Sequence, residues 1–524
     1  MCFCSIIKAQ IIFHKTYGGF ADDKASCVRT TQDGGYIIVG STKSFGAGGS
    51  DVYVIKTNHF GDTIWTRTYG GSVDDIGSAV IQTATGSYVI VGSTFSFGAG
   101  QQDIYVIKLT GNGDTIWTRT YGGSSFESGN DIKPTTDGGY IIVGSTNSYG
   151  ATNSDLYLVK INSSGDTVWT KTFGGIGDES GNSIQNLGSG GFVITGTTNS
   201  YGAGYNDVYF ITTDGNGNIV NTNITYGGSS GNEYGNSGMQ TSDGGYILGG
   251  STTSFGAGLS DAYLLKTDVN GTIQNQKAFG GTSYDRINEV QQTNDGGFIA
   301  VGTTQSFGGG NSYIYLLKTD PTLVLNWSKY IGGTSFNEGN SVTQTNDGGY
   351  IIAGSTQSFG QGGYDIYLVK TDVNGFSDCN GYPANTISTT AVSQVQHPTP
   401  TLSFGCNPKR DSTFVGHGGV VTSVCFEWEG IDEIHANRGE AIIYPNPVAY
   451  KTYLKINELI NLDAPINLKL YDVLGKEINI SFSRETSGTN SLQLLLNIEN
   501  IPLGNYFLKT AIGDRFYSNI LIVQ

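Results

Sequence analysis

Carboxylate side chains that recur at fixed places could bind cations, and this chain carries two such sets in its first 370 residues. The first set follows a Gly-rich segment, with Tyr313 in the corresponding place of one copy: Asp51, Asp103, Asp155, Asp207, Asp261 and Asp365. The second set follows a Tyr-Gly-Gly or related turn: Asp23, Asp75, Glu127, Glu179, Glu233, Asp285 and Glu338. Calcium prefers oxygen ligands, so a cation at these positions is one interpretation.

A structural role is the competing interpretation for both sets. An Asp in a turn accepts backbone N–H bonds and fixes the loop, and a residue present in nearly every copy is explained by what every copy needs. No stretch has EF-hand spacing: 214–218 comes nearest, but Thr225 stands where a bidentate Glu is required. We therefore predict no metal and no cofactor, and retain the second set as candidate binding residues on one rim.

Catalytic motifs are not recognisable in this sequence. The five His residues are scattered, at His14, His59, His397, His417 and His435, and neither HExxH nor GxSxG occurs. The Gly-rich FGAGGSD segment is followed by no helix that could serve a phosphate loop. The turn at Asp62 departs from the SxDxGxTW pattern of sialidase-type propellers, and Arg67 and Arg119 share one repeat position. We expect a protein that is not an enzyme.

The acidic positions belong to a long internal repeat. An aromatic residue after a Gly pair, or after Gly-Ser, recurs with a spacing of 52 residues and once 54, at Tyr36, Tyr88, Tyr140, Phe192, Tyr246, Phe298 and Tyr350. A period near 40–50 residues is typical of β-propeller blades. Each unit contains four strand-like runs separated by Gly-rich turns, as in SCVRTT, YIIVGSTKS, DVYVIKT and TIWTRTY. Four antiparallel strands per unit are typical of a propeller blade.

The ends of the repeat region predict a closed ring. The run TIWTRTYGG and its looser versions end at Gly71, Gly123, Gly175, Gly228, Gly281 and Gly333, and none follows Lys370. The missing copy stands at the N-terminus, at 11–19. Supplying the last strand from the N-terminus would remove two exposed sheet edges. The sequence therefore predicts an all-β fold in which a seven-bladed β-propeller, residues 11–376, is closed by an N-terminal strand.

The repeats also resemble a known family. The segments YGGSVDDIGSAV, DGGYIIVGST and GGSDVYVIKTNHFGDTIWTRTYGG are similar to the secreted bacterial SBBP β-propeller repeats, over residues 11–377. The resemblance implies the fold and says little about a ligand. Cys27 replaces Ala79 and Ser183 of other copies, which indicates a small buried thiol.

Composition excludes several classes of protein. Gly makes up 79 of 524 residues and charged residues only 14%, against about 25% in an average soluble domain. The net charge of −16 argues against nucleic acid, because phosphate binding needs a basic patch. No run of 18 apolar residues occurs, so we expect no transmembrane segment.

The remaining chain divides into three parts. Residues 1–10 are interpreted as the remnant of a signal peptide, ending in Lys8-Ala9-Gln10. Residues 377–440 lose the repeat and are predicted to be a Ser/Thr/Pro-containing linker with three cysteines, Cys379, Cys406 and Cys425, of which two could form one disulfide in any pairing. Residues 441–524 contain alternating strand-like runs and are predicted to form a small Ig-like β-sandwich.

This last part carries motifs in a distinctive order: Tyr444-Pro445-Asn446-Pro447, then Gly475-Lys476 after LYDVL, then Gly504-Asn505-Tyr506. They resemble the type A sorting domain, or Por secretion tail, of the type IX secretion system. The resemblance implies export through the periplasm by the type IX machinery to the outer cell surface or the extracellular space.

These observations favour a secreted or cell-surface propeller that acts as a non-catalytic binding or adhesion module for a glycan or a protein. Two alternatives remain: a passive component of an extracellular layer or filament and, less favoured, a polysaccharide or peptide hydrolase. The hydrolase alternative requires one face of the propeller to carry clustered polar residues that do not repeat, whereas glycan-array or cell-binding assays separate the other two. The departures from the repeat found in the sequence are scattered: Tyr205, Arg286, Tyr313 and Phe336.

Overall fold

A computed structural model of the chain describes residues 11–150, 152–377, 380–391, 394–396, 414–416, 420–428, 441–444, 451–456, 466–472, 477–486, 492–498, 501–502, 504–512 and 515–523. The described residues form strands and no helix, which confirms the predicted all-β fold. They accordingly include no helix that could cross a membrane. The chain divides into two compact units, Met1–Glu429 and Gly430–Gln524.

In the first unit, six sheets are each built from four strands that are consecutive in sequence and antiparallel to their neighbours. The first three consist of β2 (Asp23–Thr30), β3 (Tyr36–Thr42), β4 (Asp51–Thr57) and β5 (Thr63–Gly70); β6 (Asp75–Gln82), β7 (Tyr88–Thr94), β8 (Asp103–Leu109) and β9 (Thr115–Tyr121); and β10 (Glu127–Pro134), β11 (Tyr140–Thr146), β12 (Asp155–Ile161) and β13 (Thr167–Phe173). The next three consist of β14 (Glu179–Asn186), β15 (Phe192–Thr198), β16 (Asp207–Thr213) and β17 (Ile219–Gly227); β18 (Glu233–Gln240), β19 (Tyr246–Thr252), β20 (Asp261–Thr267) and β21 (Ile273–Gly280); and β22 (Asp285–Gln292), β23 (Phe298–Thr304), β24 (Tyr313–Thr319) and β25 (Leu325–Ile331).

A seventh sheet joins the two ends of the repeat region. It contains β26 (Asn337–Gln344), β27 (Tyr350–Thr356) and β28 (Asp365–Thr371), and its next strand is β1 (Ile11–Gly18). β1 pairs antiparallel with β28 from Phe13 opposite Lys370 to Tyr17 opposite Ile366. The Tyr17 hydroxyl donates to the carbonyl of Gly61 in the following sheet, as the Tyr69 hydroxyl donates to Gly113. β1 therefore takes the place of a fourth strand in this sheet.

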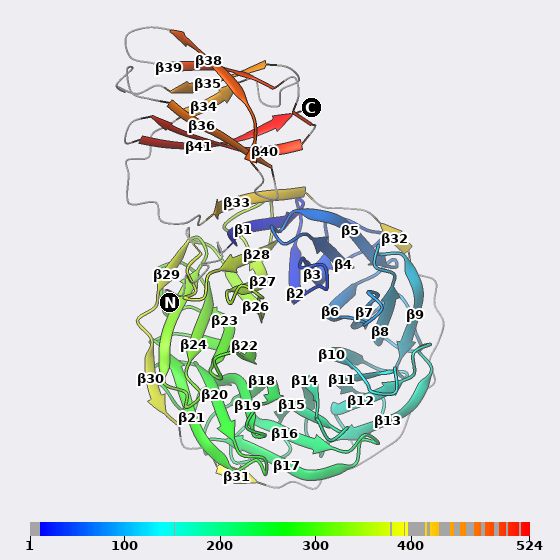
Figure 1. Ribbon diagram of the computed structural model, residues 1–524. Helices are drawn as coiled ribbons and strands as arrows, with labels where there is room; N and C mark the ends of the chain where they lie inside the picture. The colour runs from blue at the N-terminus through cyan, green and yellow to red at the C-terminus, as the bar shows by residue number, and fades with distance from the viewer. Residues whose placement is uncertain are drawn as a thin grey trace, which may run out of the picture. The chain divides into compact units, whose positions relative to one another are not determined.

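The apolar cores lie between successive sheets, which follow one another around a common centre (Figure 1). One core combines Val39, Val52 and Val54 of the first sheet with Ile90 and Ile107 of the second. Another combines Phe13 and Leu368 of the sheet that contains β1 with Val28 and Ile38 of the first sheet. The second and third strands of each sheet are buried along almost their whole length, which explains their apolar runs.

The first strand of every repeat carries an irregularity that directs side chains toward the centre. In β2 the register with β3 shifts between Ala25 and Cys27, and corresponding shifts occur in β6, β10, β14, β18, β22 and β26. A bulge inserts one unpaired residue and re-aims its side chain. The bulged residues, Ser26 in β2 and Asn130 in β10 among them, line the central cavity described below.

The predicted linker contains short strands that lie along outer sheet edges. β29 (Gly381–Pro383), β30 (Ile387–Thr390) and β31 (Gln394–Gln396) pair with β25, β21 and β17, and β32 (Phe414–Gly416) and β33 (Val420–Trp428) pair with β5 and β1. The sequence indicates no strand here, because Ser, Thr and Pro dominate and no periodicity survives. The side chains of Cys379, Cys406 and Cys425, and residues 1–10 with the predicted signal remnant, lie outside what the structure describes.

The second unit consists of two antiparallel sheets. One contains β34 (Ala441–Tyr444), β35 (Lys451–Ile456), β39 (Leu492–Asn497) and β38 (Ser481–Thr486); the other contains β37 (Glu477–Ile478), β36 (Ile466–Asp472), β40 (Gly504–Ile512) and β41 (Arg515–Val523). Leu454 and Leu494 of one sheet share a buried core with Leu470, Leu508 and Leu521 of the other. Two sheets over one core agree with the sandwich predicted for this region.

The pairing of β1 with β28 predicts a strong effect of N-terminal truncation. Deleting residues 1–19 removes several ladder hydrogen bonds, each worth about 0.5–1.5 kcal/mol. It also removes the buried side chains of Ile12 and Tyr17, each worth about 1.5–3 kcal/mol. This loss rivals the ~5–15 kcal/mol that stabilise a typical domain. We expect a sharply lower melting temperature by calorimetry, or aggregation through the exposed edge of β28.

A circular permutation is the control for this deletion. Placing the segment after Thr371 through a short linker should restore the folded protein, because the strand regains its place beside β28. A deletion variant that melts within a few degrees of the parent and stays monomeric would contradict the structural role of β1.

Candidate functional site

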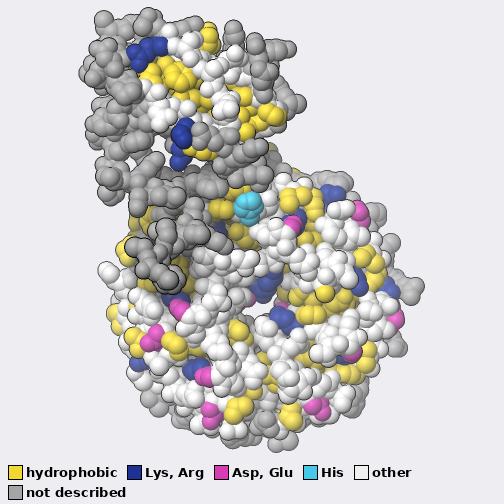
Figure 2. All heavy atoms as spheres, viewed as in Figure 1, with side chains coloured by type: hydrophobic (Ala, Val, Ile, Leu, Met, Phe, Trp, Pro, Cys, Tyr) yellow, Lys and Arg dark blue, Asp and Glu magenta, His cyan; other side chains and the backbone are white. Residues whose placement is uncertain are grey.

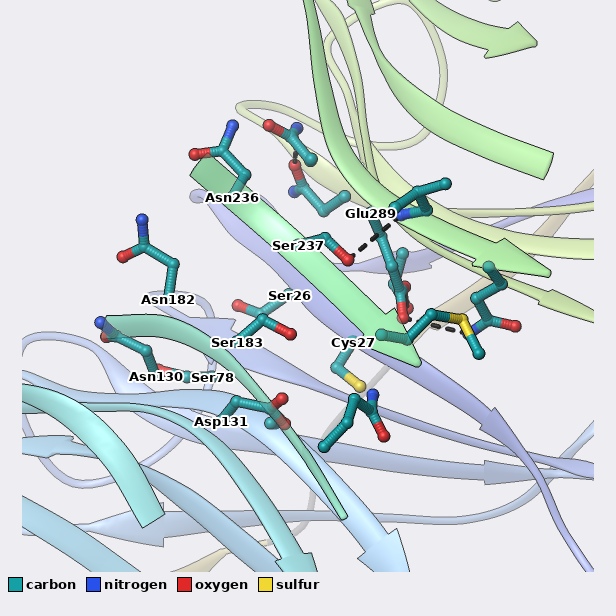
Figure 3. Close-up of a pocket in the computed structure, with 18 of the residues that line it drawn as sticks. Ser26, Cys27, Ser78, Asn130, Asp131, Asn182, Ser183, Asn236, Ser237 and Glu289 are labelled. Atoms are coloured by element: carbon teal, nitrogen blue, oxygen red, sulfur yellow. Dashed lines mark hydrogen bonds between the residues drawn. The ribbon is translucent and has the colours of Figure 1, made fainter. Parts of the chain in front are cut away.

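The inner strands of the seven sheets surround a polar cavity of about 360 Å³ (Figure 3). Each inner strand contributes side chains from two adjacent positions of the repeat. The bulge position is occupied by Ser26, Ser78, Asn130, Asn182, Asn236, Asn288 and Asn340, and the next position by Cys27, Ala79, Asp131, Ser183, Ser237, Glu289 and Ser341. The bulge described above is the local feature that turns both positions toward the centre.

In five of the seven sheets, an Asn side chain at the bulge position forms a hydrogen bond to the next sheet. The amide nitrogen donates to a backbone carbonyl of the next inner strand, over distances of 2.9 Å (Asn130 to Gly181), 2.8 Å (Asn182 to Gly235), 2.7 Å (Asn236 to Ile287), 2.8 Å (Asn288 to Gly339) and 2.8 Å (Asn340 to Ala25). Ser26 and Ser78 are the two shorter side chains at this position. The cavity wall therefore differs between its first two sheets and the other five.

The next position supplies a second set of ties between sheets. Ser237 Oγ accepts a hydrogen bond from the N–H of Val290 (3.2 Å), and Ser341 Oγ accepts one from the N–H of Val28 (3.1 Å). The carboxylate of Glu289 takes the same role toward Val342 (2.9 Å). A short acceptor side chain here satisfies a backbone donor at the junction that would otherwise be buried without a partner.

Asp131 is a charged variant of this acceptor. Its Oδ2 accepts from the N–H of Ile184 in the next sheet (3.0 Å), and its Oδ1 from the N–H of Ile132 in its own strand (2.8 Å). Ala79 has no side-chain oxygen to offer Ile132, which explains the second bond. The Lys133 ammonium lies 2.6 Å and 2.8 Å from the two carboxylate oxygens and balances the charge. Asp131 is thus fully satisfied although it is only 8% exposed.

A second ion pair joins sheets that are distant in sequence but lie close together along the cavity wall. The Arg29 guanidinium lies 3.0 Å from Glu289 and donates to Ser341 Oγ (3.0 Å), so it links the first, sixth and seventh sheets. Burial opposes the charged form, but the carboxylates of Glu289 and Asp131 raise the pKa of Arg29. Burial raises the pKa of the Cys27 thiol, with Arg29 opposing the shift. Cys27 is a free, buried cysteine, as its small-residue position indicated.

The cavity wall carries hydrogen-bonding groups and no net charge. Two acids, Asp131 and Glu289, face two bases, Arg29 and Lys133, among uncharged Ser and Asn side chains. Lys and Arg side chains are visible at the central opening in Figure 2. Among the described residues, no group of three or more His, Cys, Asp and Glu side chains could hold a metal ion. The wall of the cavity therefore presents uncharged hydrogen-bonding groups together with two balanced ion pairs.

The acidic set predicted at one rim is buried rather than presented to solvent. Asp23, Asp75, Glu127, Glu179, Glu233 and Asp285 each begin an inner strand and are at most 1% exposed. Each accepts a hydrogen bond from the second glycine of the preceding turn, at 2.7 Å in Asp23, Asp75, Glu127 and Glu179, 2.6 Å in Glu233 and 2.8 Å in Asp285. These carboxylates fix the turn that leads into each sheet.

Glu338, the seventh predicted member of this set, does not occupy the equivalent position. Asn337 does: its amide nitrogen donates to the carbonyl of Gly333 (2.9 Å), and its amide oxygen accepts from Thr356 (2.7 Å). Glu338 is the following residue, half-buried and 3.9 Å from Arg286. Counting four residues from the second glycine of the turn, as from Gly19 to Asp23, would have identified Asn337.

The Asp residues after the Gly-rich segment hold that segment in place. Asp51 Oδ2 accepts hydrogen bonds from the N–H groups of Ala47 (3.0 Å) and Gly48 (3.3 Å). Asp51 does not line the cavity.

His14, on β1, is buried against Tyr367, and its burial lowers its pKa to about 3. The imidazole ring is therefore uncharged at ordinary pH. It does not line the cavity either.

Sequence reasoning missed the charged residues of the cavity. Cys27, Asp131 and Glu289 occupy one repeat position that otherwise holds Ala or Ser, and Arg29 and Lys133 lie two residues further on. A comparison of the seven copies position by position would have found this cluster. Tyr205, noted instead as a departure from the repeat, is 72% exposed in a loop.

The predicted sorting motif is described in part. Gly504 begins β40, and Tyr506 is buried in the same strand, where its hydroxyl donates to the carbonyl of Pro502 (2.7 Å). Tyr444 ends β34. The other motif residues, Pro445, Asn446, Pro447, Gly475 and Lys476, lie outside the described residues.

Comparison with known proteins identifies this C-terminal part. Residues 442–524 match the family model of the secretion system C-terminal sorting domain. The comparison with curated proteins returns no match. The sorting domain marks the protein as cargo of the type IX secretion system, exported to the cell surface or the extracellular space. The expected interaction with the type IX machinery rests on the same domain.

The double role of Asp131 predicts a cost for its removal. Asp131→Ala should leave the N–H of Ile184 without its acceptor and Lys133 without its counter-charge. We expect the free energy of unfolding, measured by denaturant titration, to fall by about 2–4 kcal/mol. Asp166→Ala, in an exposed hairpin turn, is the matched control and should change it by less than about 1 kcal/mol. Equal effects of the two substitutions would refute this role of Asp131.

Proposed function

We propose that the first unit is a seven-bladed β-propeller, closed by its N-terminal strand, that acts outside the cell as a non-catalytic binding or adhesion module. The observation that carries the proposal is the central cavity, where side chains that depart from the repeat gather among Asn and Ser hydroxyl and amide groups. The closed ring is supported by the pairing of β1 with β28 and by the tie from Asn340 to Ala25. The SBBP-type repeat remains a resemblance that agrees with this architecture.

The ligand best suited to this cavity is a short glycan. Amide and hydroxyl groups exchange hydrogen bonds with sugar hydroxyls, and the balanced charges of the cavity do not select a strongly charged ligand. A non-catalytic role is favoured because the nucleophilic groups of the wall are engaged in structural contacts. Cys27 is held as a buried thiol, and Ser341 Oγ donates to Glu289 (2.7 Å) while it accepts from Arg29 and from the N–H of Val28. A passive component of an extracellular layer is the second candidate, and the repeated architecture favours it.

Export is tested with the sorting domain alone. A reporter that carries a Sec signal and residues 430–524 should reach the cell surface of a host with type IX secretion, because the matched domain lies within this segment. Surface exposure is measured by antibody labelling of intact cells. The same reporter without residues 430–524 is the control and should stay in the periplasm. Periplasmic retention of the complete fusion would refute the assignment.

Binding is tested by filling the cavity. Ser78→Trp places a large ring on the cavity wall at a position that holds Ser rather than a tying Asn. On a glycan array, we expect the full chain to bind and Ser78→Trp to lose at least about tenfold in affinity. Ser163→Trp, in an exposed turn, is the matched control and should bind like the parent. Absence of binding by the parent, or equal binding by Ser78→Trp, would favour the passive role.

A further inference from the structure

The two acidic sets meet at the junctions between sheets. At six junctions, the Asp that begins the third strand of one sheet faces the acid that begins the first strand of the next. A Cβ atom added to the intervening glycine would contact both carboxylates, which pair as Asp51–Asp75, Asp103–Glu127, Asp155–Glu179, Asp207–Glu233, Asp261–Asp285 and Asp365–Asp23. All of these residues are at most 2% exposed. Two carboxylates therefore share one buried space at each junction.

The hydrogen bonds within the Asp207–Glu233 pair are unequal. Glu233 accepts from the N–H of Gly228 (2.6 Å) and from Thr252 Oγ1 (2.6 Å). Asp207 Oδ2 accepts from the N–H of Ala203 (3.1 Å), but Asp207 Oδ1 is buried with no hydrogen-bond partner among the described residues. This Asp207 oxygen is the one that lies beside the Glu233 carboxylate.

Neither Asp207 nor Glu233 takes part in an ion pair with a described residue. The ion pairs nearby in the sequence use other carboxylates, such as Asp243 with Lys266 and Glu289 with Arg29. Two ionised carboxylates in contact at a buried site repel one another strongly, and a single shared proton removes that repulsion. The proton also supplies the hydrogen bond that the buried oxygen lacks.

The seventh junction is an exception in which both members change together. Tyr313 replaces the Asp, and Asn337 replaces the acid of the next sheet. The Tyr313 hydroxyl donates to Gly308 (3.1 Å), and the Asn337 amide donates to Ser312 (3.0 Å). Loss of one carboxyl group accompanies loss of the other, so the two behave as one unit. The junction forms without charge.

We propose that the Asp207–Glu233 pair holds one proton, carried by Asp207 and donated to the carboxylate of Glu233 in the next sheet. This junction is then a pH-sensitive contact that is strongest under mildly acidic conditions and weakens as the proton is lost. This inference concerns the stability of the unit and does not depend on the proposed ligand.

The pKa of Asp207 agrees with this assignment. Burial, and then the charge of Glu233, raise it to about 6. Burial also raises the pKa of Asp365 to about 7, and Asp23 adds to that shift. In the Asp261–Asp285 pair, burial raises the pKa of both acids, so the proton is assigned to neither of them.

The surroundings of the pairs contain further acids and tyrosines. Tyr53 on β4 faces Asp365 and Asp23, and Tyr315 on β24 faces Asp261 and Asp285. Tyr263 holds the corresponding position beside Asp207 and Glu233. Near Asp365, Asp22 accepts from the N–H of Tyr364 (3.0 Å), and the Lys24 ammonium lies over the Tyr364 ring (4.1 Å). Lys24 is exposed, so water screens its charge from the pair.

The direction of the pH dependence follows from these shifts. An unfolded Asp releases its proton near pH 3.9, about two units before Asp207 does so in the folded protein. The folded state thus binds more protons between about pH 4 and pH 6, and stability falls as pH rises through that window. Asp243 has the opposite pH dependence. Burial alone would raise its pKa, but hydrogen bonds from Thr241 and Lys266 lower it to about 2. Its contribution to the free energy of unfolding is therefore lost as pH falls below about 4.

The test uses the full chain and Asp207→Asn, because an amide resembles the protonated acid and cannot lose a charge. Unfolding is followed by circular dichroism in denaturant between pH 4 and pH 8. We expect Asp207→Asn to match the parent at pH 4 and, at pH 8, to have an unfolding equilibrium constant about 100-fold smaller. The matched control, Asp243→Asn, should be less stable than the parent at pH 8, because it loses its Lys266 partner.

Three outcomes would overturn the proposal. One is an Asp207→Asn protein that is less stable than the parent at pH 8 with an unchanged pH slope. Another is stabilisation of the parent, but not of Asp207→Asn, by added calcium at pH 8, which would assign a cation to the pair. If Asp207→Asn does not fold, infrared spectroscopy of the parent decides. Protonated carboxyl bands that persist at pH 6 support the proposal, and their absence contradicts it.

Discussion

The pairing of β1 with β28 is the constraint on which the rest of the first unit depends. β1 is continuous in sequence with β2 and hydrogen-bonded to β28, so it binds the first sheet to the last. This junction allows Asn340 to reach Ala25 and Ser341 to reach Val28 at the cavity wall. It also brings Asp365 against Asp23. The polar contacts that join one sheet to the next along the chain thus also join the seventh sheet to the first.

The charge of buried carboxylates at the junctions between sheets is compensated in two ways. Six of the seven sheets carry the same buried acid, as in Asp75 and its equivalents, and where this acid meets a second one, as Glu233 meets Asp207, a shared proton compensates the charge. Where the copies differ, a Lys or Arg provides the compensation, as Lys133 does for Asp131. The second solution places charged groups in the cavity. The proposed ligand site and the contacts that join the sheets therefore use the same inner strands.

Much of this fold could be predicted from the sequence, because the same pattern of strands and turns recurs in every copy of the repeat. The strand-like runs, the glycine turns and the displaced strand at 11–19 could all be recognised. The acidic set was also found, but its burial was not, since a single sequence does not tell which side of a turn a carboxylate faces. Glu338 was assigned in place of Asn337 because the last copy places an acid one residue later. The strands at 381–396 could not be predicted, because they depend on edges supplied by β25, β21 and β17 rather than on their own residues.

Native-state hydrogen exchange across β1 and β28 tests the central claim most directly. If β1 is an integral strand of the last sheet, the amides of Phe13, Lys15 and Tyr17 should exchange with the same free energy of opening as those of β28, because both open only in global unfolding. Exchange of β1 at a much lower free energy than β28 would show that this strand detaches on its own. That result would contradict an account in which the first and last sheets form one closed structure.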